Sequence, residues 1–142
     1  SIVGDNVDVA AIDDCRWACR DLPAYDHVRW AIPGDDLTVC VEVDGLRLGV
    51  FHGHQVRGQG KVQAWHDKQA GNHRPIGAAD LLVSGHYHSF RCEWLGPRTW
   101  VQLPSEDAGS PQYAESAGAG ARRSGSVTID VESGSVGDVR IV

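Results

Sequence analysis

The stretch Ala79-Asp-Leu-Leu-Val-Ser-Gly-His-Tyr-His88 organises the chain, because it joins a short apolar run to a glycine and two closely spaced histidines. A second stretch upstream, Leu46-Arg-Leu-Gly-Val-Phe-His-Gly-His54, has the same form. An apolar run of this length that is bounded by a glycine is typical of a buried strand. Open α/β sheets bind their ligands at the carboxyl ends of the strands. The two stretches therefore predict a ligand site at the ends of two neighbouring strands.

Both stretches end in residues that suit a metal ion. Alternate residues of a strand face the same side, so His86 and His88 can point together. Gly53 and Gly85 permit a close approach of the backbone. Neutral imidazole is a common nitrogen ligand for zinc, manganese, iron and nickel. We therefore expect a metal site that is assembled from the two strands.

The remaining chain alternates predicted strands with two predicted helices. Asp44-Gly45 separates two apolar runs and is the signature of a two-residue hairpin turn. Apolar residues recur at helical spacing from Asp8 to Leu22, and Lys61 to Ala70 has helical composition. The predicted strands cover residues 28–32, 37–43, 46–51, 80–85, 90–95, 99–103, 126–131 and 139–142. These elements predict a mixed α/β (α+β) fold, with a long mobile surface loop over residues 104–125.

Composition limits the classes of function. The chain has 142 residues, so we expect residues 1–142 to form a single domain. The net charge is −6 and there is no sustained basic run, so nothing indicates a nucleic-acid partner. No apolar stretch is long enough to cross a membrane, and no signal-peptide pattern opens the chain. The four cysteines match no zinc ribbon or finger, and we expect them to be reduced in a cytoplasmic protein.

The two histidine stretches resemble the last two signature blocks of the calcineurin-like metallophosphoesterases. In that family an H-G-H block is followed by a helix and then by a strand that ends in G-H-x-H. Phe51-His-Gly-His-Gln-Val56 and Val83-Ser-Gly-His-Tyr-His-Ser-Phe90 match these blocks in order and separation. The chain is particularly similar to the small members, which include phage and bacterial phosphodiesterases and the phosphoesterase-like subunit of retromer. The similarity covers residues 28–103 and implies the C-terminal half of a β-sandwich with a mixed sheet and flanking helices.

The resemblance implies a hydrolase that uses two divalent metal ions, manganese or zinc, with iron and nickel as alternatives. By this analogy His52 and His86 bind one metal and His88 binds the other. His54 lies behind the ligands or faces the substrate, which makes it the catalytic candidate. A metal pair of this kind activates a water molecule for attack on a phosphodiester or a phosphomonoester. The identity of the phosphorylated substrate is not implied.

The chain departs from the family in the blocks that supply carboxylates. The family opens with D-x-H, then G-D-x-x-D, then G-N-H-[DE], and this sequence contains no D-x-H. Gly4-Asp-Asn-Val-Asp8 fits the letters of the second block, which makes Asp5 the candidate metal ligand there. Asp35, Asp36 or another chain are the alternative sources of the missing acids.

A further match falls in the wrong place. Gly71-Asn-His-Arg74 mimics the third block, but it lies between the two histidine blocks. We interpret it as the end of a helix. We expect His66 and His73 to be exposed to solvent.

The missing blocks indicate a partial phosphoesterase domain whose first half is absent or carried on another chain. Half of a two-sheet sandwich leaves one face of a sheet uncovered, and large exposed apolar patches mark partner surfaces. We therefore expect a homo-oligomer or a complementing chain that carries the N-terminal half. The tryptophans that make this concern concrete are Trp17, Trp30, Trp65, Trp94 and Trp100.

Three functions remain open at this point. The first is metal-dependent phosphoester hydrolysis, with His52, His86 and His88 as ligands. The second is a catalytically inactive phosphoesterase-like module for binding or assembly, as in retromer. The third is a mononuclear zinc site, structural or hydrolytic. The intact histidine blocks favour the first, and the missing carboxylate blocks favour the second.

Overall fold

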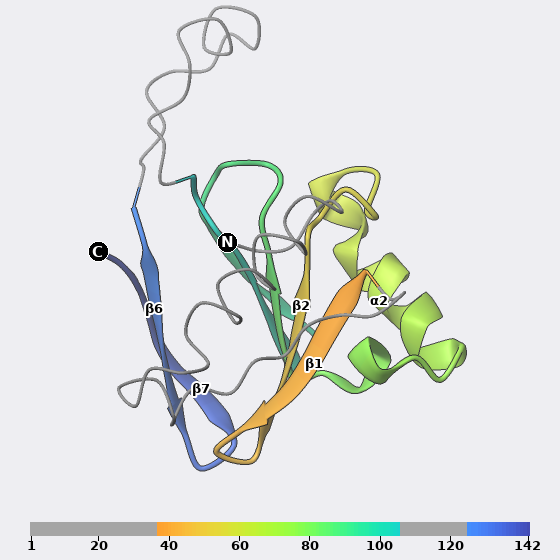
Figure 1. Cartoon of the computed structure of the whole chain (residues 1–142), viewed down its shortest axis with the longest axis horizontal. Coiled ribbons are helices and arrows are strands. Elements are labelled where there is room, and N and C mark those ends of the chain that lie inside the picture. Colours follow the sequence, from red (N-terminus) through yellow and green to blue (C-terminus); the bar gives the residue numbers. More distant parts are fainter. Residues whose placement is uncertain (1–36, 106–124) are drawn as a thin grey trace, which may run out of the picture.

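A computed structural model describes residues 37–105 and 125–142. The described chain forms three layers, in which a five-stranded sheet lies between a two-stranded ribbon and a layer of helices (Figure 1). The strands of the sheet are β1 (Thr38–Val43), β2 (Leu46–Phe51), β3 (Leu81–Ser84), β4 (Arg91–Leu95) and β5 (Arg98–Gln102). Their order is β1-β2-β3-β5-β4. The three central strands run parallel, and the two edge strands pair with them antiparallel. The predicted α+β class with a mixed sheet is confirmed.

The β1–β2 hairpin forms as its sequence predicts. Asp44 and Gly45 have φ values of 47° and 78°. Two positive φ values in a row define the type I′ turn that connects two strands through two residues. Aspartate and glycine are among the residues that adopt this conformation most readily. The predicted strands at 37–43 and 46–51 are confirmed to within one residue.

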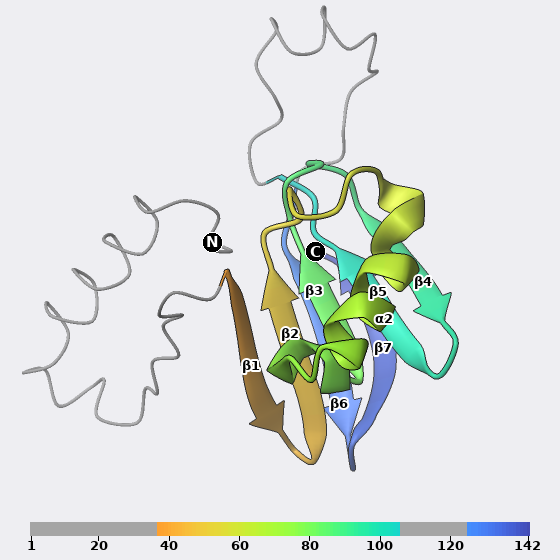
Figure 2. The same cartoon turned by 90° about the vertical axis from the view of Figure 1, so that its right-hand side faces the viewer.

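A helical layer covers one face of the sheet and carries the chain from β2 to β3 (Figure 2). Parallel neighbouring strands require a crossover of this kind. Phe51, Leu82 and Trp100 are buried beneath this layer. The layer consists of η2 (Gln59–Lys61), α2 (Val62–Gly71) and η3 (Pro75–Ala78). The predicted helix over 61–70 is confirmed to within one residue.

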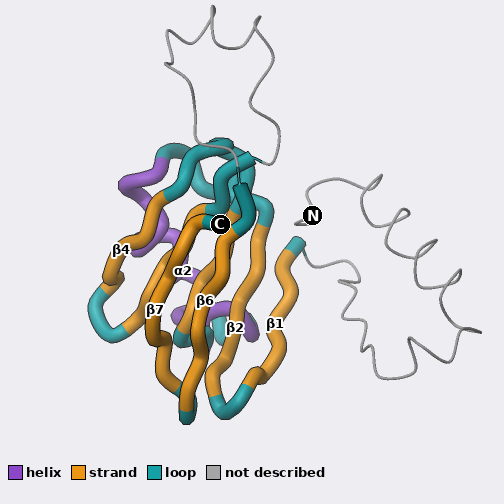
Figure 3. The backbone as a smooth tube through the Cα atoms, turned by 90° about the vertical axis from the view of Figure 1, so that its left-hand side faces the viewer, coloured by secondary structure: helices purple, strands orange, loops and turns teal. Residues whose placement is uncertain are grey.

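The ribbon of β6 (Val127–Glu132) and β7 (Ser135–Ile141) covers the opposite face of the sheet (Figure 3). Its apolar side chains pack against Leu81, Val83 and Val101, which point away from the helices. The predicted strand at 126–131 is confirmed to within one residue. The last strand begins at Ser135 rather than at the predicted residue 139. The predicted start is too late because small and polar residues interrupt the apolar alternation in the first part of this strand.

The turns of the two hairpins meet at one end of the molecule. The backbone N–H of Ser133 donates to Oδ2 of Asp44 at 2.8 Å. Ser133 and Gly134 repeat the pair of positive φ values found in the first turn, at 50° and 78°. A Cβ on Gly134 would lie 3.3 Å from the carbonyl oxygen of Gly45. The two layers are therefore joined at this end by backbone contact between glycines.

The C-terminus of α2 explains the misplaced family-like motif. His73 has a φ of 54°, and its N–H donates to the Ala70 carbonyl while the Arg74 N–H donates to Gln69. This pattern of bonds, with a left-handed residue after the helix, is the Schellman motif. His73 is exposed. The interpretation of the motif as a helix end is therefore confirmed.

The expectation of uncovered tryptophans is wrong for part of the set. Trp100 is 1% exposed, and its indole N–H donates to Oγ of Ser84 at 2.9 Å. Trp65 is half-buried and stacks on Phe51, with ring centroids 4.5 Å apart. Trp94 on edge strand β4 is 76% exposed. Both faces of the sheet are covered, one by the helical layer and the other by the ribbon, and the described chain contains both of these layers.

Part of the sequence prediction lies outside the described residues. It comprises the helix over 8–22, the strand over 28–32, most of the loop over 104–125, and the residues Asp5, Trp17, Trp30, Asp35 and Asp36. Within residues 37–105 and 125–142, none of the helices has the length and apolar character needed to span a membrane.

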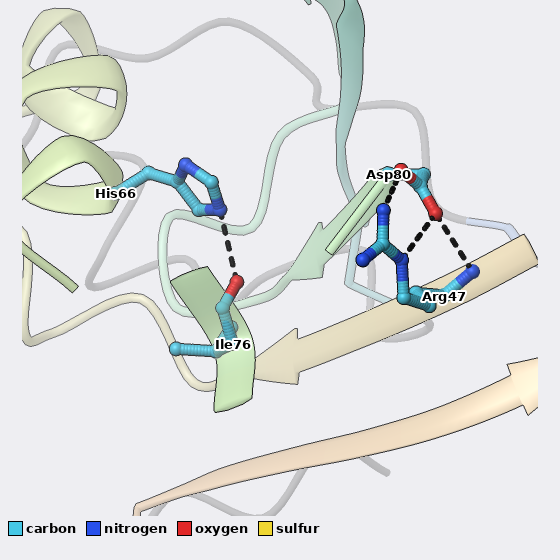
Figure 4. Close-up of polar contacts among 4 residues, drawn as sticks. All are labelled: Arg47, His66, Ile76 and Asp80. Atoms are coloured by element: carbon cyan, nitrogen blue, oxygen red, sulfur yellow. Dashed lines mark hydrogen bonds and ion pairs between the residues drawn. The ribbon is translucent and has the colours of Figure 1, made fainter. Parts of the chain in front are cut away.

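The expectation that His66 is exposed is wrong. Its side chain lies on the inner face of α2 and is fully buried. Its Nε2–H donates to the Ile76 carbonyl at 2.9 Å (Figure 4). Val62 precedes it by one helical turn and is also buried, so both side chains face the sheet. Nδ1 has no hydrogen-bond partner within the described ranges. Burial lowers the pKa of His66, with the hydrogen bond to Ile76 opposing this effect.

This buried histidine predicts a loss of stability in acid. Below pH 6.5 the unfolded chain binds a proton at His66 that the folded chain excludes, so the free energy of unfolding falls as pH decreases. The slope from this residue is at most about 1.4 kcal/mol per pH unit. Urea unfolding of the wild type and His66→Leu between about pH 5 and 8 measures it. His73→Asn, which removes an exposed histidine, is the control variant, and equal slopes in the wild type and His66→Leu contradict the prediction.

The close packing of η3 on α2 can be tested at Gly77. A Cβ at this position would lie 2.3 Å from the backbone nitrogen of Ala70 and 2.4 Å from its Cα. Gly77→Ala should therefore reduce the free energy of unfolding by at least about 1–3 kcal/mol, the usual cost of overpacking. Gly71→Ala is the matched control, because a Cβ there meets nothing within 4 Å. A Gly77→Ala protein as stable as the control in chemical unfolding would refute this account.

Candidate metal centre

The histidines at the ends of β2 and β3 come together because the two strands are paired in register. Phe51 lies opposite Ser84 in the parallel ladder. The ladder continues one step further, since the N–H of Gly85 donates to the His52 carbonyl at 2.9 Å. The rings of His52 and His86 therefore leave adjacent positions, and Nε2 of the first lies 3.1 Å from Nδ1 of the second.

The same register is fixed at the opposite end of the strands. Asp80 precedes β3, and its carboxylate accepts hydrogen bonds from the backbone N–H, Nε and Nη2 of Arg47 at 3.1, 2.9 and 2.9 Å (Figure 4). The hydrogen bond from the Arg47 side chain lowers the pKa of Asp80. A bidentate arginine–carboxylate pair has a preferred planar geometry, so this contact favours one alignment of β2 with β3.

A cavity opens beside the paired histidines at the carboxyl ends of β2, β3 and β5. Its volume is about 540 Å³. His52, His86 and His88 line one side. The other side is formed where β5 ends and β6 begins, so the cavity lies between the sheet and the ribbon. The residues from this second side are Leu103, Pro104, Ser105, Gly125, Ser126 and Val127.

His54 lies next to the pair but outside the lining of this cavity. Its ring centroid is 5.2 Å from that of His52 and 6.3 Å from that of His86. The N–H of Val56 donates to the Gly53 carbonyl at 3.1 Å, which closes a turn with His54 at its outer corner. The strand conformation ends at this turn, so the two-residue alternation that would align His54 with His52 no longer applies.

Both turns that carry the histidines depart from ordinary backbone geometry. His86 and His88 have φ values of 68° and 50°, in the left-handed region that non-glycine residues seldom occupy. Gly53 has a φ of 116°, and a Cβ there would lie 3.0 Å from the Gly85 carbonyl oxygen. Strain of this kind persists only where the surrounding structure enforces it, and it is concentrated at functional sites.

The histidine pair has the spacing of two ligands on one ion. Two nitrogens bound to one zinc ion at about 2.0–2.1 Å lie about 2.8–3.4 Å apart at angles between square and tetrahedral. The 3.1 Å separation of the His52 and His86 nitrogens falls within this range. Within residues 37–105 and 125–142, however, no group of three histidine, cysteine, aspartate or glutamate side chains converges on one point. The pair fits a metal ion, and further donors are needed to complete the coordination.

Comparison with solved structures places the fold. Vps29 from Entamoeba histolytica, in a structure complexed with Zn²⁺, matches with a TM-score of 0.53 and 18% identity over 77% of this chain and 60% of that one. Vps29 from Chaetomium thermophilum matches with a TM-score of 0.52 and 18% identity over 68% of this chain and 48% of that one. A single mutant of the Entamoeba protein matches with a TM-score of 0.53 and 16% identity over 100% of this chain and 91% of that one.

The chain has the fold of Vps29. In the first two alignments it spans 60% and 48% of the Vps29 chain. No protein-family model matches the chain, and no curated protein matches it.

The second side of the cavity is not predicted by the sequence. Ser105 and Ser126 line it, and the N–H of Gly125 donates to the Ser105 carbonyl at 3.3 Å. Ser105 lies near the start of the loop over 104–125, and Ser126 follows that loop as the first residue of the strand predicted over 126–131. No local motif marks them, and the sequence signal is their position at the two ends of the loop.

Gly53 provides a test of how closely the two histidine turns must approach. Gly53→Ala places a Cβ 3.0 Å from both the Gly85 oxygen and the His86 Cβ at a φ of 116°. It should cost about 1–3 kcal/mol in stability and separate the rings of His52 and His86. Chemical unfolding and the ring-to-ring nuclear Overhauser effect (NOE) report these two changes.

Gly96→Ala is the matched control for this test. Gly96, in the turn between β4 and β5, also has a positive φ, of 64°, but a Cβ there meets nothing within 4 Å. It should show the backbone strain without the loss of ring contact. If Gly53→Ala retains the NOE, close contact between the turns is not required for the pairing.

Proposed function

We propose that this chain contributes the histidine side of a metal-dependent phosphoesterase site. The single observation that supports it most is the 3.1 Å approach of the His52 and His86 nitrogens at the edge of a cavity of about 540 Å³. The resemblance of both histidine stretches to metallophosphoesterase blocks and the Vps29 fold point the same way. The Entamoeba Vps29 structure holds Zn²⁺.

His52 and His86 are the proposed ligands of one divalent ion, manganese or zinc, and His88 is the proposed ligand of a second. A bound metal ion would activate water and polarise the phosphoryl oxygens of an ester. His52, His86 and His88 line the cavity that would receive the phosphoryl group. Ser105 and Ser126 also line this cavity.

His54 has a different proposed task from the three ligands. It is exposed, and its ring lies 5.2 Å from that of His52. From this place the imidazole can reach the part of an ester that extends out of the cavity. A histidine there can donate a proton to the departing oxygen.

The missing donors are the main requirement of this proposal. Of the residues that line the cavity in the described part of the chain, none is a carboxylate. Asp5 is the proposed additional ligand, with Asp35 and Asp36 as alternatives. A second copy or a complementing chain with the N-terminal half is the other proposed source.

Metal binding and turnover test this proposal together. The purified chain should bind two Mn²⁺ or Zn²⁺ ions by calorimetry and hydrolyse bis(p-nitrophenyl) phosphate or p-nitrophenyl phosphate. His52→Ala and His86→Ala should each weaken metal affinity by more than about tenfold, because even the loss of a residue that orients a ligand costs that much. His73→Asn is the control, since this residue is exposed at the end of α2. Unchanged affinity in both alanine variants rejects the proposed ligands.

A catalytically inactive binding or assembly module is the second candidate. It is favoured by the absence of carboxylates from the described cavity lining. The same calorimetry separates the candidates. A chain that binds no metal in the presence of either ion supports the assembly module, and one tightly bound zinc ion without turnover supports a mononuclear structural site.

A further inference from the structure

Tyr87 lies between the two histidines of the second stretch, and its side chain reaches across to the first. Its hydroxyl donates to the Val56 carbonyl at 2.8 Å and accepts from the Gly58 N–H at 3.0 Å. Both partners belong to the turn that follows His52 and His54. The hydroxyl thus bridges the two histidine turns, and both its donor and its acceptor capacity are used.

The backbone around Tyr87 shows why such a bridge is needed. The Tyr87 N–H donates to the Gly85 carbonyl at 2.8 Å, across a His86 whose φ is 68°. A bond between residues two apart with a positive central φ is the rare, strained form of the γ-turn. Strained residues relax unless neighbouring contacts hold them. The side chain of Tyr87 supplies such a contact directly after His86.

The turn that Tyr87 grips is itself anchored in the core. Val56 is 3% exposed and belongs to the cluster beneath the helices, together with Phe51 and Val62. The core therefore fixes the Val56 side chain, and the Tyr87 hydroxyl fixes the Val56 carbonyl. The Lys61 N–H donates to the Gly58 carbonyl at 3.0 Å and connects this turn to the helical layer.

The Tyr87 ring also contacts His86 directly. The two ring centroids are 5.0 Å apart at an interplanar angle of 76°. This edge-to-face arrangement is favourable for aromatic rings and restricts the rotation of the imidazole. The half-buried tyrosine thereby acts on both the backbone and the side chain of the proposed ligand.

We propose that Tyr87 is the positioning residue of the histidine site, and that its hydroxyl bridge to the turn at 56–58 holds His86 against His52. This inference rests on the proposed metal-binding function. It assigns Tyr87 no contact with the metal or the substrate. Its effect is exerted through the γ-turn at His86 and through the close approach of the two turns.

Tyr87→Phe in the full chain tests the proposal, because it removes only the hydroxyl and keeps the ring. The amide of Gly58 should exchange with solvent at least about tenfold faster in the variant, since it loses a partner. The NOE between the rings of His52 and His86 should weaken. Zinc affinity, measured by calorimetry, should fall about ten- to a hundredfold, the usual effect of losing a residue that orients a ligand.

Asp44→Ala is the matched control for a change that merely lowers stability. It also removes a side-chain oxygen that binds a loop backbone, the bond from the Ser133 N–H. That bond lies at the opposite end of the two layers. Asp44→Ala should therefore lower the melting temperature while it leaves the NOE and the zinc affinity as in the wild type.

The outcomes separate this proposal from the proposed function. A Tyr87→Phe chain that retains the NOE and binds zinc within about twofold of the wild type overturns the role of Tyr87. Equal losses of zinc affinity in Tyr87→Phe and Asp44→Ala also overturn it, because a general loss of stability then explains both. If the wild type binds neither zinc nor manganese, the proposed function fails, and the NOE with the Gly58 exchange rate still decides the position of His86.

Discussion

The parallel pairing of β2 with β3 is the constraint on which the candidate site depends. Successive residues of a strand point to opposite faces, so a slip of one residue would send every side chain of a strand to the wrong side. The Arg47–Asp80 ion pair favours the observed alignment at one end, and the bond from Gly85 to His52 extends it at the other. His52 and His86 are therefore brought together by the sheet itself, and the loops that follow need only adjust the rings.

Local signals in the sequence were sufficient for most of the elements. Asp44-Gly45 predicted the first hairpin because few other residue pairs adopt two positive φ values. The burial of His66 was missed because a histidine on a polar helix resembles a surface residue. Only its position one turn after Val62 indicates the inner face, and its hydrogen bond to Ile76 depends on how η3 packs against α2. Trp100 was misjudged for a similar reason, since its burial depends on how the helical layer covers the sheet.

The candidate site was predictable only where strands determine it. The approach of His52 to His86 follows from apolar runs that end in glycine and histidine, because the ends of parallel neighbours meet at one edge. The position of His54 does not follow, because the turn after Gly53 ends the alternation. Ser105, Ser126 and the contacts of Tyr87 arise from loops that are far apart in sequence. Their placement depends on the packing of complete layers, which no short motif records.

The contact between the two glycine-containing turns has a consequence for how this chain can vary. Gly45 and Gly134 are too close for either loop to lengthen without displacing the other. Insertions and substitutions are therefore restricted at that end of the molecule. The end beside the cavity is restricted in the same way, because a Cβ on Gly53 would lie 3.0 Å from the Gly85 oxygen and a Cβ on Gly125 would lie 2.8 Å from the Val142 oxygen. Substitution should therefore be tolerated best away from both ends of the layers, at exposed turns such as that of Gly96 between β4 and β5, where a Cβ meets nothing within 4 Å.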